Sequence, residues 1–84
     1  MSEGQIRPAD RLLLTLHNFG IVNEKVGKTD NELVQIGGIS VEQLRDILNT
    51  HETAGYLESI TDRNGSKRYF LTGKGIIRVS SAFT

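Results

Sequence analysis

The chain has no cysteine among its 84 residues. A disulfide framework, a thiolate nucleophile and every cysteine-ligated zinc or iron–sulfur site are therefore excluded, and a reducing cytosol suits this composition. No apolar run approaches the ~18–20 residues needed to span a bilayer, and residues 1–5 lack the basic start and apolar stretch of a signal peptide. The sequence thus predicts a soluble, cytoplasmic protein with no membrane partner.

Acidic residues are missing from the C-terminal quarter. Residues 63–84 carry five cations and no acid, whereas residues 1–62 carry five cations against all ten acids, so the local charges are +5 and −5. The five cations of the second segment are Arg63, Lys67, Arg68, Lys74 and Arg78. The zero net charge therefore conceals a basic segment, which suits either a phosphate-bearing partner or simple solubility.

The length and composition predict one small folded domain over residues 1–84. Apolar residues make up 37% of the chain, and glycine plus proline occupy few positions, which is typical of a globular protein. A chain this short excludes a two-domain enzyme with an interdomain cleft. It also buries little apolar surface, so dimerisation would add to a thin stability margin.

Local patterns predict three helices in the first two thirds of the chain. The first helix covers 9–19, where Leu12, Leu16 and Phe19 fall on one stripe. Residues 21–28 lack a helical period and predict a loop or a short strand. Capping boxes that begin at Thr29 and Ser40 start helices over 30–37 and 41–54, with a glycine turn between them. The stripe expected to be buried on the third helix is Val41, Leu44, Ile47, Leu48 and Ala54.

The last third of the chain predicts a β-hairpin and a terminal helix. Two strand-like segments, 56–60 and 67–71, flank residues 62–66, which include Asn64-Gly65, a pair typical of a type I′ turn. Thr72 can cap a helix over 73–82, with Ile76, Val79 and Phe83 at near-helical spacing. Gly73 and Gly75 are interpreted as helix-capping glycines.

Three stretches, read in this order of elements, resemble the winged-helix family of transcription regulators, of the small prokaryotic and archaeal type. They are Ala54-Gly55-Tyr56-Leu57, the hairpin segment 61–69, and Phe70-Leu71-Thr72-Gly73-Lys74-Gly75. The resemblance covers residues 9 to about 80. It implies an α+β winged helix-turn-helix, with a three-helix core, a wing of two or three antiparallel strands and a C-terminal helix. It also implies that the third helix enters the major groove of double-stranded DNA while the wing contacts the backbone or minor groove.

Polar residues suited to DNA lie in both of these elements. Hydrogen-bonding groups on the third helix are able to meet base edges, and the long cations beside the hairpin tip are able to reach phosphates. The candidate DNA-binding residues are Ser40, Gln43, Arg45, Asn49, Thr50, Arg63, Asn64, Lys67 and Arg68. Because a single chain offers few phosphate contacts, we expect a homodimer on two half-sites. The candidate dimer residues are Ile76, Val79 and Phe83, together with Leu13 or Leu14, although the same side chains could instead pack within one chain.

A second interpretation is a protein–protein interaction module. The third helix carries Glu42, Asp46 and Glu52 against Arg45, which is acidic for a surface that lies on phosphates. Such a helix equally suits a protein partner within a transcription or assembly complex. The operator, the regulated genes, the direction of regulation and any small-molecule effector are left open by the sequence.

Enzyme functions find no support in the sequence. Gly27-Lys28-Thr29 lacks the glycine that a phosphate-binding loop needs five residues earlier, where Val22 stands. No spacing indicates a metal site, a cofactor site or a catalytic pair. His17 and His51 are interpreted as structural, with His51 half-buried and its polar tip at the surface, although an imidazole that responds to pH or contacts a ligand is the alternative.

Overall fold

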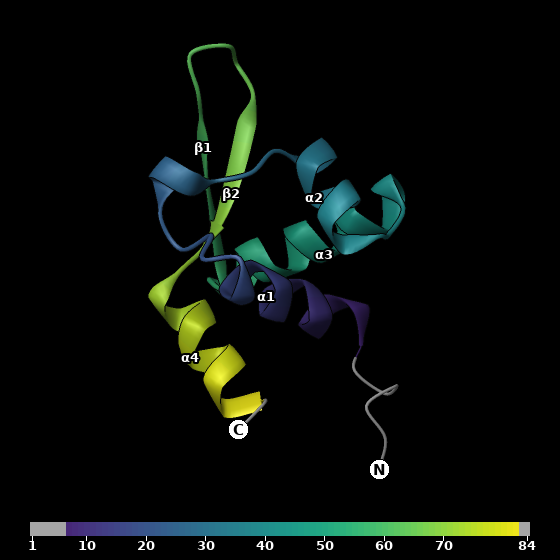
Figure 1. Cartoon of the computed structure of the whole chain (residues 1–84), viewed down its shortest axis with the longest axis vertical. Coiled ribbons are helices and arrows are strands. Elements are labelled where there is room, and N and C mark those ends of the chain that lie inside the picture. The colour runs from purple at the N-terminus through teal and green to yellow at the C-terminus, as the bar shows by residue number, and fades with distance from the viewer. Residues whose placement is uncertain (1–6, 83–84) are drawn as a thin grey trace.

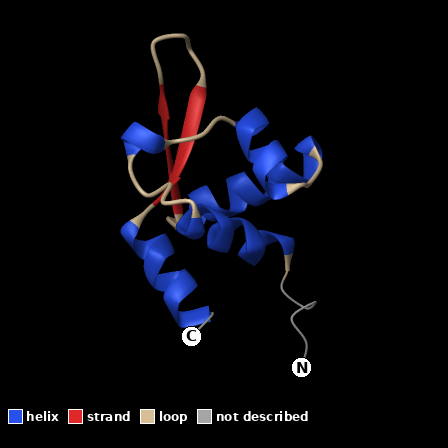
Figure 2. Ribbon diagram, viewed as in Figure 1, coloured by secondary structure: helices blue, strands red, loops and turns tan. Residues whose placement is uncertain are grey.

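The computed structural model describes residues 7–82, and these fold around three central α-helices (Figures 1 and 2). A β-hairpin extends at one end of the molecule and a fourth α-helix lies at the other. In chain order the elements are α1 (Pro8–Asn18), the short 3-10 helix η2 (Glu24–Val26), α2 (Asp30–Gly37), α3 (Val41–Ala54), β1 (Leu57–Thr61), β2 (Lys67–Leu71) and α4 (Gly73–Ala82). The α+β class predicted from the sequence is confirmed.

Side-chain caps set the starts of α2 and α3. The Thr29 hydroxyl accepts the backbone N–H of Glu32 (3.3 Å), and the Glu32 carboxylate accepts the backbone N–H of Thr29 (2.9 Å), which completes a capping box. Ser40 starts α3 by accepting the backbone N–H of Gln43 (3.1 Å). Between them Gly38 has a φ of 65°, which glycine adopts at little cost. These local signals produce the helix-turn-helix.

The two strands pair antiparallel, from Leu57 opposite Leu71 to Thr61 opposite Lys67. We call the hairpin with its loop, residues 57–71, the wing. In the described residues the sheet has two strands, and the segment that was expected to be a loop or strand adds one bridge, between Lys28 and Tyr69. Most of 21–28 is therefore loop and 3-10 helix that runs beside β2 (Figure 1).

The type I′ turn predicted at Asn64-Gly65 is wrong. Gly65 has a φ of 82°, but no non-glycine residue of the described chain has a positive φ, so Asn64 lacks the conformation that this turn requires. The connection does span residues 62–66, as the sequence indicated, but with a different backbone conformation. The loop conformation follows from Asp62, whose carboxylate accepts hydrogen bonds from the backbone N–H groups of Asn64 and Ser66, each at 2.9 Å. This Asx-type bonding favours a longer loop.

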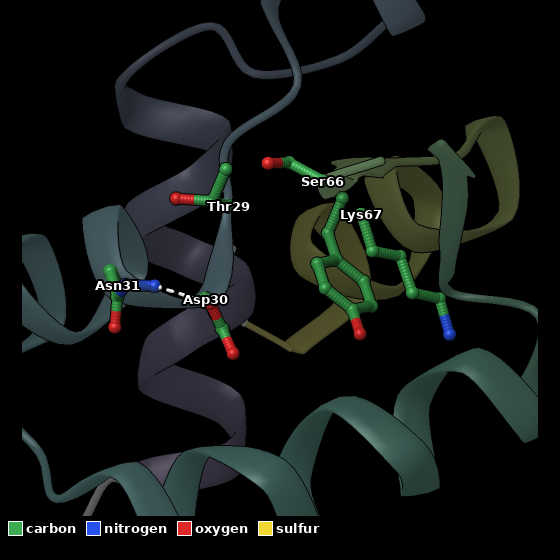
Figure 3. Close-up of a pocket in the computed structure, with 6 residues that line it drawn as sticks. Thr29, Asp30, Asn31, Ser66 and Lys67 are labelled. Atoms are coloured by element: carbon green, nitrogen blue, oxygen red, sulfur yellow. Dashed lines mark hydrogen bonds between the residues drawn. The ribbon is translucent and has the colours of Figure 1, made fainter. Parts of the chain in front are cut away.

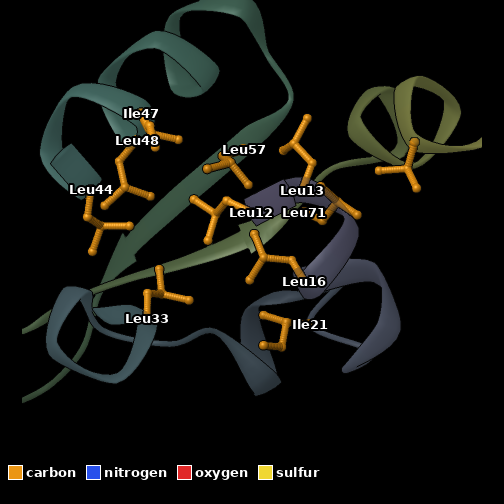
Figure 4. Packing of buried hydrophobic residues seen from close by; sticks show 11 residues of the cluster. Leu12, Leu13, Leu16, Ile21, Leu33, Leu44, Ile47, Leu48, Leu57 and Leu71 are labelled. Atoms are coloured by element: carbon orange, nitrogen blue, oxygen red, sulfur yellow. The ribbon is translucent and has the colours of Figure 1, made fainter. Parts of the chain in front are cut away.

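Apolar side chains from the helices and both strands form one core (Figure 4). Its buried members are Leu12, Leu13, Leu16, Ile21, Leu33, Leu44, Ile47, Leu48, Leu57, Leu71 and Val79. Helix α4 joins this core by packing against α1 and β2. The wing loop and the outer face of α3 extend away from the core, so both remain available for contact with a partner.

Two residues expected on the apolar stripes of their helices are exposed. Phe19 is 64% exposed, because α1 ends at Asn18 and the helical stripe does not continue, and Val41 in the first turn of α3 is 38% exposed. Leu13 and Val79, two of the proposed dimer residues, are instead core members at 1% and 3% exposure.

The remaining dimer candidates are Leu14, Ile76 and Phe83. Leu14 and Ile76 are partly buried against the core, and Phe83 lies outside the described residues. For Val79 and Leu13 the alternative of packing within one chain is correct, since both side chains are buried in the core.

His51 is buried rather than half-exposed. Only 5% of the residue is accessible, and its Nε2 lies 2.9 Å from the carbonyl oxygen of Ala9. Because a carbonyl only accepts, Nε2 carries the proton and donates it, and this bond ties α3 to the start of α1. His51 Nδ1 has no partner among the described residues. The expectation of a polar tip at the surface is therefore wrong, and the imidazole holds two helices together.

Candidate nucleic-acid interface

The outer face of α3 displays four of the predicted base-reading residues. Gln43, Arg45, Asn49 and Thr50 are all exposed, because Leu44, Ile47, Leu48 and His51 turn the opposite face of the helix into the core. The fifth candidate on this helix is Ser40. Its side chain is already engaged in capping, which leaves one hydroxyl proton for a further contact.

Helical spacing divides these residues between two flanks of α3. Arg45 and Asn49 stand four residues apart on the flank that faces the wing. Gln43 and Thr50, seven residues apart, share the other flank. The structure therefore does not gather all the candidates into one cluster, and it brings only Arg45 and Asn49 close to the wing.

A hollow lies between α3, the start of α2 and strand β2. It consists of two adjoining cavities of about 300 and 250 Å³, which share Asp30, Lys67 and Tyr69. Thr29, Asp30 and Asn31 border the first cavity on the helix side, while Ser66 and Lys67 border it on the wing side (Figure 3). Arg45, Asn49 and Glu52 border the second. The lining is polar, and it mixes acids with bases.

Sequence reasoning missed Asp30, Asn31 and Tyr69 as members of this surface. Tyr69 lies two residues after Lys67 on the same face of β2, and the Lys67 Nζ stands 5.4 Å from the centre of the Tyr69 ring. This alternation was a usable signal. Asp30 and Asn31 gave none, because their neighbours across the hollow come from distant parts of the chain.

The wing cations differ in what surrounds them. Arg63 and Asn64 are exposed in the loop, and Arg63 has no acidic partner among residues 7–82. The Lys67 Nζ lies 3.7 Å from Glu52 on α3, in an ion pair that remains half-exposed. Outside the wing, Arg78 on α4 pairs with Asp10 of α1 at 3.3 Å. Ion pairs with the acidic part of the chain therefore neutralise some of the positive charge that lies after residue 62.

Arg68, predicted to reach phosphates from beside the hairpin tip, bonds to groups of the protein. Its Nε donates to Asp62 at 2.8 Å, and its Nη1 donates to the Gly27 carbonyl at 3.2 Å and lies 3.5 Å from Glu32. The Arg68 guanidinium lowers the pKa of Asp62, with help from the backbone N–H of Ser66. The backbone N–H of Thr29 lowers the pKa of Glu32. Both carboxylates are thus held ionised beside the guanidinium.

The described residues offer neither a metal site nor a membrane-spanning helix. Residues 7–82 hold no group of three or more histidine, aspartate or glutamate side chains placed to bind a metal ion. None of the described helices has the length and apolar character that crossing a membrane requires.

Solved structures of known regulators have the same arrangement of elements. MepR of Staphylococcus aureus, a transcription regulator of the multidrug efflux pump MepA, matches with a TM-score of 0.75 and 19% identity over 89% of this chain. The complex of MepR with DNA matches with a TM-score of 0.74 and 18% identity over 92% of this chain. This chain spans 53% and 60% of the length of these two MepR chains.

A smaller protein matches over its whole length. The DNA-binding TubR fragment of Clostridium botulinum has a TM-score of 0.78 and 19% identity, with 99% of this chain and 100% of that one covered. No protein-family model and no curated protein matches the sequence. The chain therefore has a winged helix-turn-helix fold, as its sequence predicted.

Proposed function

We propose that the chain binds double-stranded DNA and acts as a transcription regulator. The observation that carries this proposal is the exposed polar flank of α3 beside a projecting wing, in a fold shared with MepR in its DNA complex. The core holds α3 by one face only, so the other face is free to enter a major groove.

In this function the residues have separate roles. Arg45 and Asn49 lie on the flank of α3 that faces the wing. Arginine is suited to hydrogen bonding with guanine, and asparagine to hydrogen bonding with adenine. Arg63 and Asn64 at the wing tip contact the backbone or minor groove, and Lys67 reaches phosphate from β2. Ser40, Gln43 and Thr50, on the N-terminal end and far flank of α3, contact phosphates or neighbouring bases.

A salt series tests this function. The affinity for a mixed-sequence duplex is measured by fluorescence anisotropy between about 50 and 200 mM salt, over which phosphate-dominated binding falls steeply. We expect saturable binding with a steep negative slope of log affinity against log salt. Absence of binding at the lowest salt would refute the proposal.

Specificity has its own test, after an operator has been selected from random duplexes. Arg45→Ala should lower the preference for the correct base at one operator position by about 1–3 kcal/mol. The matched control is Arg11→Ala, which removes another exposed arginine, from α1. If both variants lose specificity, or if neither does, the role of Arg45 is contradicted.

One observation favours a different function. Glu42, Asp46 and Glu52 surround Arg45 on the accessible surface of α3, so this surface has an excess of negative charge. A winged helix that binds a basic protein within a larger complex would use such a surface. If no DNA binding is found, α3 is the surface on which to seek that partner.

A further inference from the structure

Arg68 joins three separate segments of the chain. Its guanidinium lies against the carboxylate of Asp62 in the wing loop, the carbonyl of Gly27 before α2 and the carboxylate of Glu32 within α2. The first contact is 2.8 Å long and the others are 3.2 and 3.5 Å. A planar guanidinium has donors that diverge in this way, whereas a lysine ammonium is a single point charge.

Each acceptor of Arg68 is itself part of a fixed local structure. Glu32 closes the capping box of α2 with Thr29, through the same carboxylate oxygen that faces Arg68. Asp62 receives Arg68 on one oxygen and the backbone N–H groups of Asn64 and Ser66 on the other. A continuous set of hydrogen bonds therefore runs from the start of α2 to the tip of the wing.

Close backbone contact supports the same connection. A side chain at Gly27 would place its Cβ 3.2 Å from the Cβ of Arg68 and 3.3 Å from the Tyr69 carbonyl, which is tighter than ordinary van der Waals contact. Next to it, Lys28 and Tyr69 exchange both backbone hydrogen bonds, at 3.0 and 2.8 Å. The loop before α2 is thus held against β2 where the guanidinium crosses between them.

We propose that Arg68 is a positioning residue, which fixes the wing relative to the helix-turn-helix and makes no phosphate contact of its own. The proposal rests on the DNA-binding function above, because the orientation of the wing decides whether Arg63 reaches a phosphate. It changes the role that the sequence predicted for Arg68. Arg63 has the exposed side chain that a phosphate contact needs, whereas Nε and Nη1 of Arg68 already bond to groups of the protein itself.

The dependence of DNA affinity on salt separates the two roles. Each lost phosphate contact reduces the magnitude of the slope of log affinity against log salt by about 0.9. Arg68→Gln should weaken binding roughly three- to ten-fold at every salt concentration, with the slope of the unsubstituted protein, because ion pairs at partly exposed sites contribute modestly. The matched control Arg63→Gln, the same change elsewhere in the wing, should reduce the magnitude of the slope by about 0.9.

Arg68→Lys supplies a second discrimination. A phosphate contact would be restored by lysine, since the charge is kept, but the three-way connection would not be. We expect Arg68→Lys to bind as weakly as Arg68→Gln. Restored affinity in Arg68→Lys, or a slope reduced in Arg68→Gln as in Arg63→Gln, would overturn the proposal.

A measurement without DNA keeps this test separate from the proposed function. Amide hydrogen exchange of Asn64 and Ser66, whose N–H groups bond to Asp62, should become several-fold faster in Arg68→Gln and stay unchanged in Arg63→Gln. Equal exchange in the two variants would overturn the positioning role. Failure of the unsubstituted protein to bind DNA, by contrast, refutes the proposed function, and hydrogen exchange still decides whether Arg68 fixes the wing.

Discussion

At the scale of single residues, Gly75 shows why some positions accept only glycine. It lies in the first turn of α4 and is buried, next to the carbonyl of Tyr56 and the side chain of Leu71. A Cβ there would press on the Tyr56 carbonyl oxygen and approach Leu71 Cδ1 to 2.7 Å. Capping is performed by Thr72, whose hydroxyl accepts the Gly75 backbone N–H at 3.0 Å. The interpretation of Gly75 as a capping glycine was therefore wrong.

Substitution of Gly75 should be costly. Gly75→Ala forces α4 away from the hairpin, and we expect the free energy of unfolding to fall by about 1–3 kcal/mol, as in overpacked cores. The control is Gly73→Ala, two residues earlier, where an added Cβ meets nothing within 4 Å. Urea denaturation of both variants measures the difference. Equal stabilities would mean that α4 does not depend on this close approach.

His51 marks the limit of prediction at the residue scale. Its spacing from Leu44 and Leu48 puts it on the buried face of α3, and that much could be inferred from the sequence. The acceptor that makes burial tolerable is the carbonyl of Ala9, 42 residues earlier in the chain. No local pattern indicates such a partner, which is why an exposed polar tip was expected instead.

At the scale of elements, the helix starts could be predicted from local caps, whereas the turn of the wing and its contacts with the helices could not. The capping residues Thr29 and Ser40 act within three residues of themselves, so the starts of α2 and α3 could be predicted. The conformation of the wing loop depends on Asp62, and Asp62 is held by Arg68, which is also bound to α2. The partners of Lys67 and Arg68 likewise follow from how the wing packs on the helices, which no spacing in the sequence reveals.

The contact between α3 and the wing leads to a prediction about DNA affinity. Glu52 accepts the Ser59 hydroxyl at 2.7 Å and lies 3.7 Å from the Lys67 Nζ, so it competes with phosphate for this lysine. Glu52→Gln keeps an oxygen for Ser59 and releases Lys67. We expect the affinity for DNA to rise about three-fold, with the magnitude of the salt slope larger by up to about 0.9, both measured by fluorescence anisotropy.

The control for this prediction is another acid on the same helix. Asp46 is exposed on α3 and has no ion pair among the described residues, so Asp46→Asn removes the same charge without releasing a lysine. It should raise affinity by general electrostatics alone and leave the slope closer to that of the unsubstituted protein. If the two variants behave alike, Glu52 has no specific hold on Lys67.

At the scale of the whole molecule, few positive charges are free to meet DNA. Of the cations predicted to bind DNA, Arg45, Arg63 and Lys67 are exposed, and Lys67 is shared with Glu52. So few phosphate contacts give one chain a weak, salt-sensitive affinity. Two chains on adjacent half-sites would together supply twice as many contacts, and we therefore propose that the chain acts as a homodimer.

The dimer surface can be sought among the exposed apolar residues. With Leu13 and Val79 committed to the core, Ile77 on the outer face of α4 is the most exposed large apolar side chain among the described residues, at 67%. Since α4 lies at the opposite end of the molecule from the wing (Figure 1), pairing through it leaves both wings free. Ile77→Ser should convert a dimer to a monomer in light scattering and weaken binding to a two-half-site operator more than to a single half-site.

Phe19→Ser, at a residue that is 64% exposed at the end of α1, is the control and should leave the mass unchanged. A monomeric mass for the unsubstituted protein at high concentration would remove the dimer hypothesis, and loss of the dimer in Phe19→Ser alone would move the interface from α4 to α1.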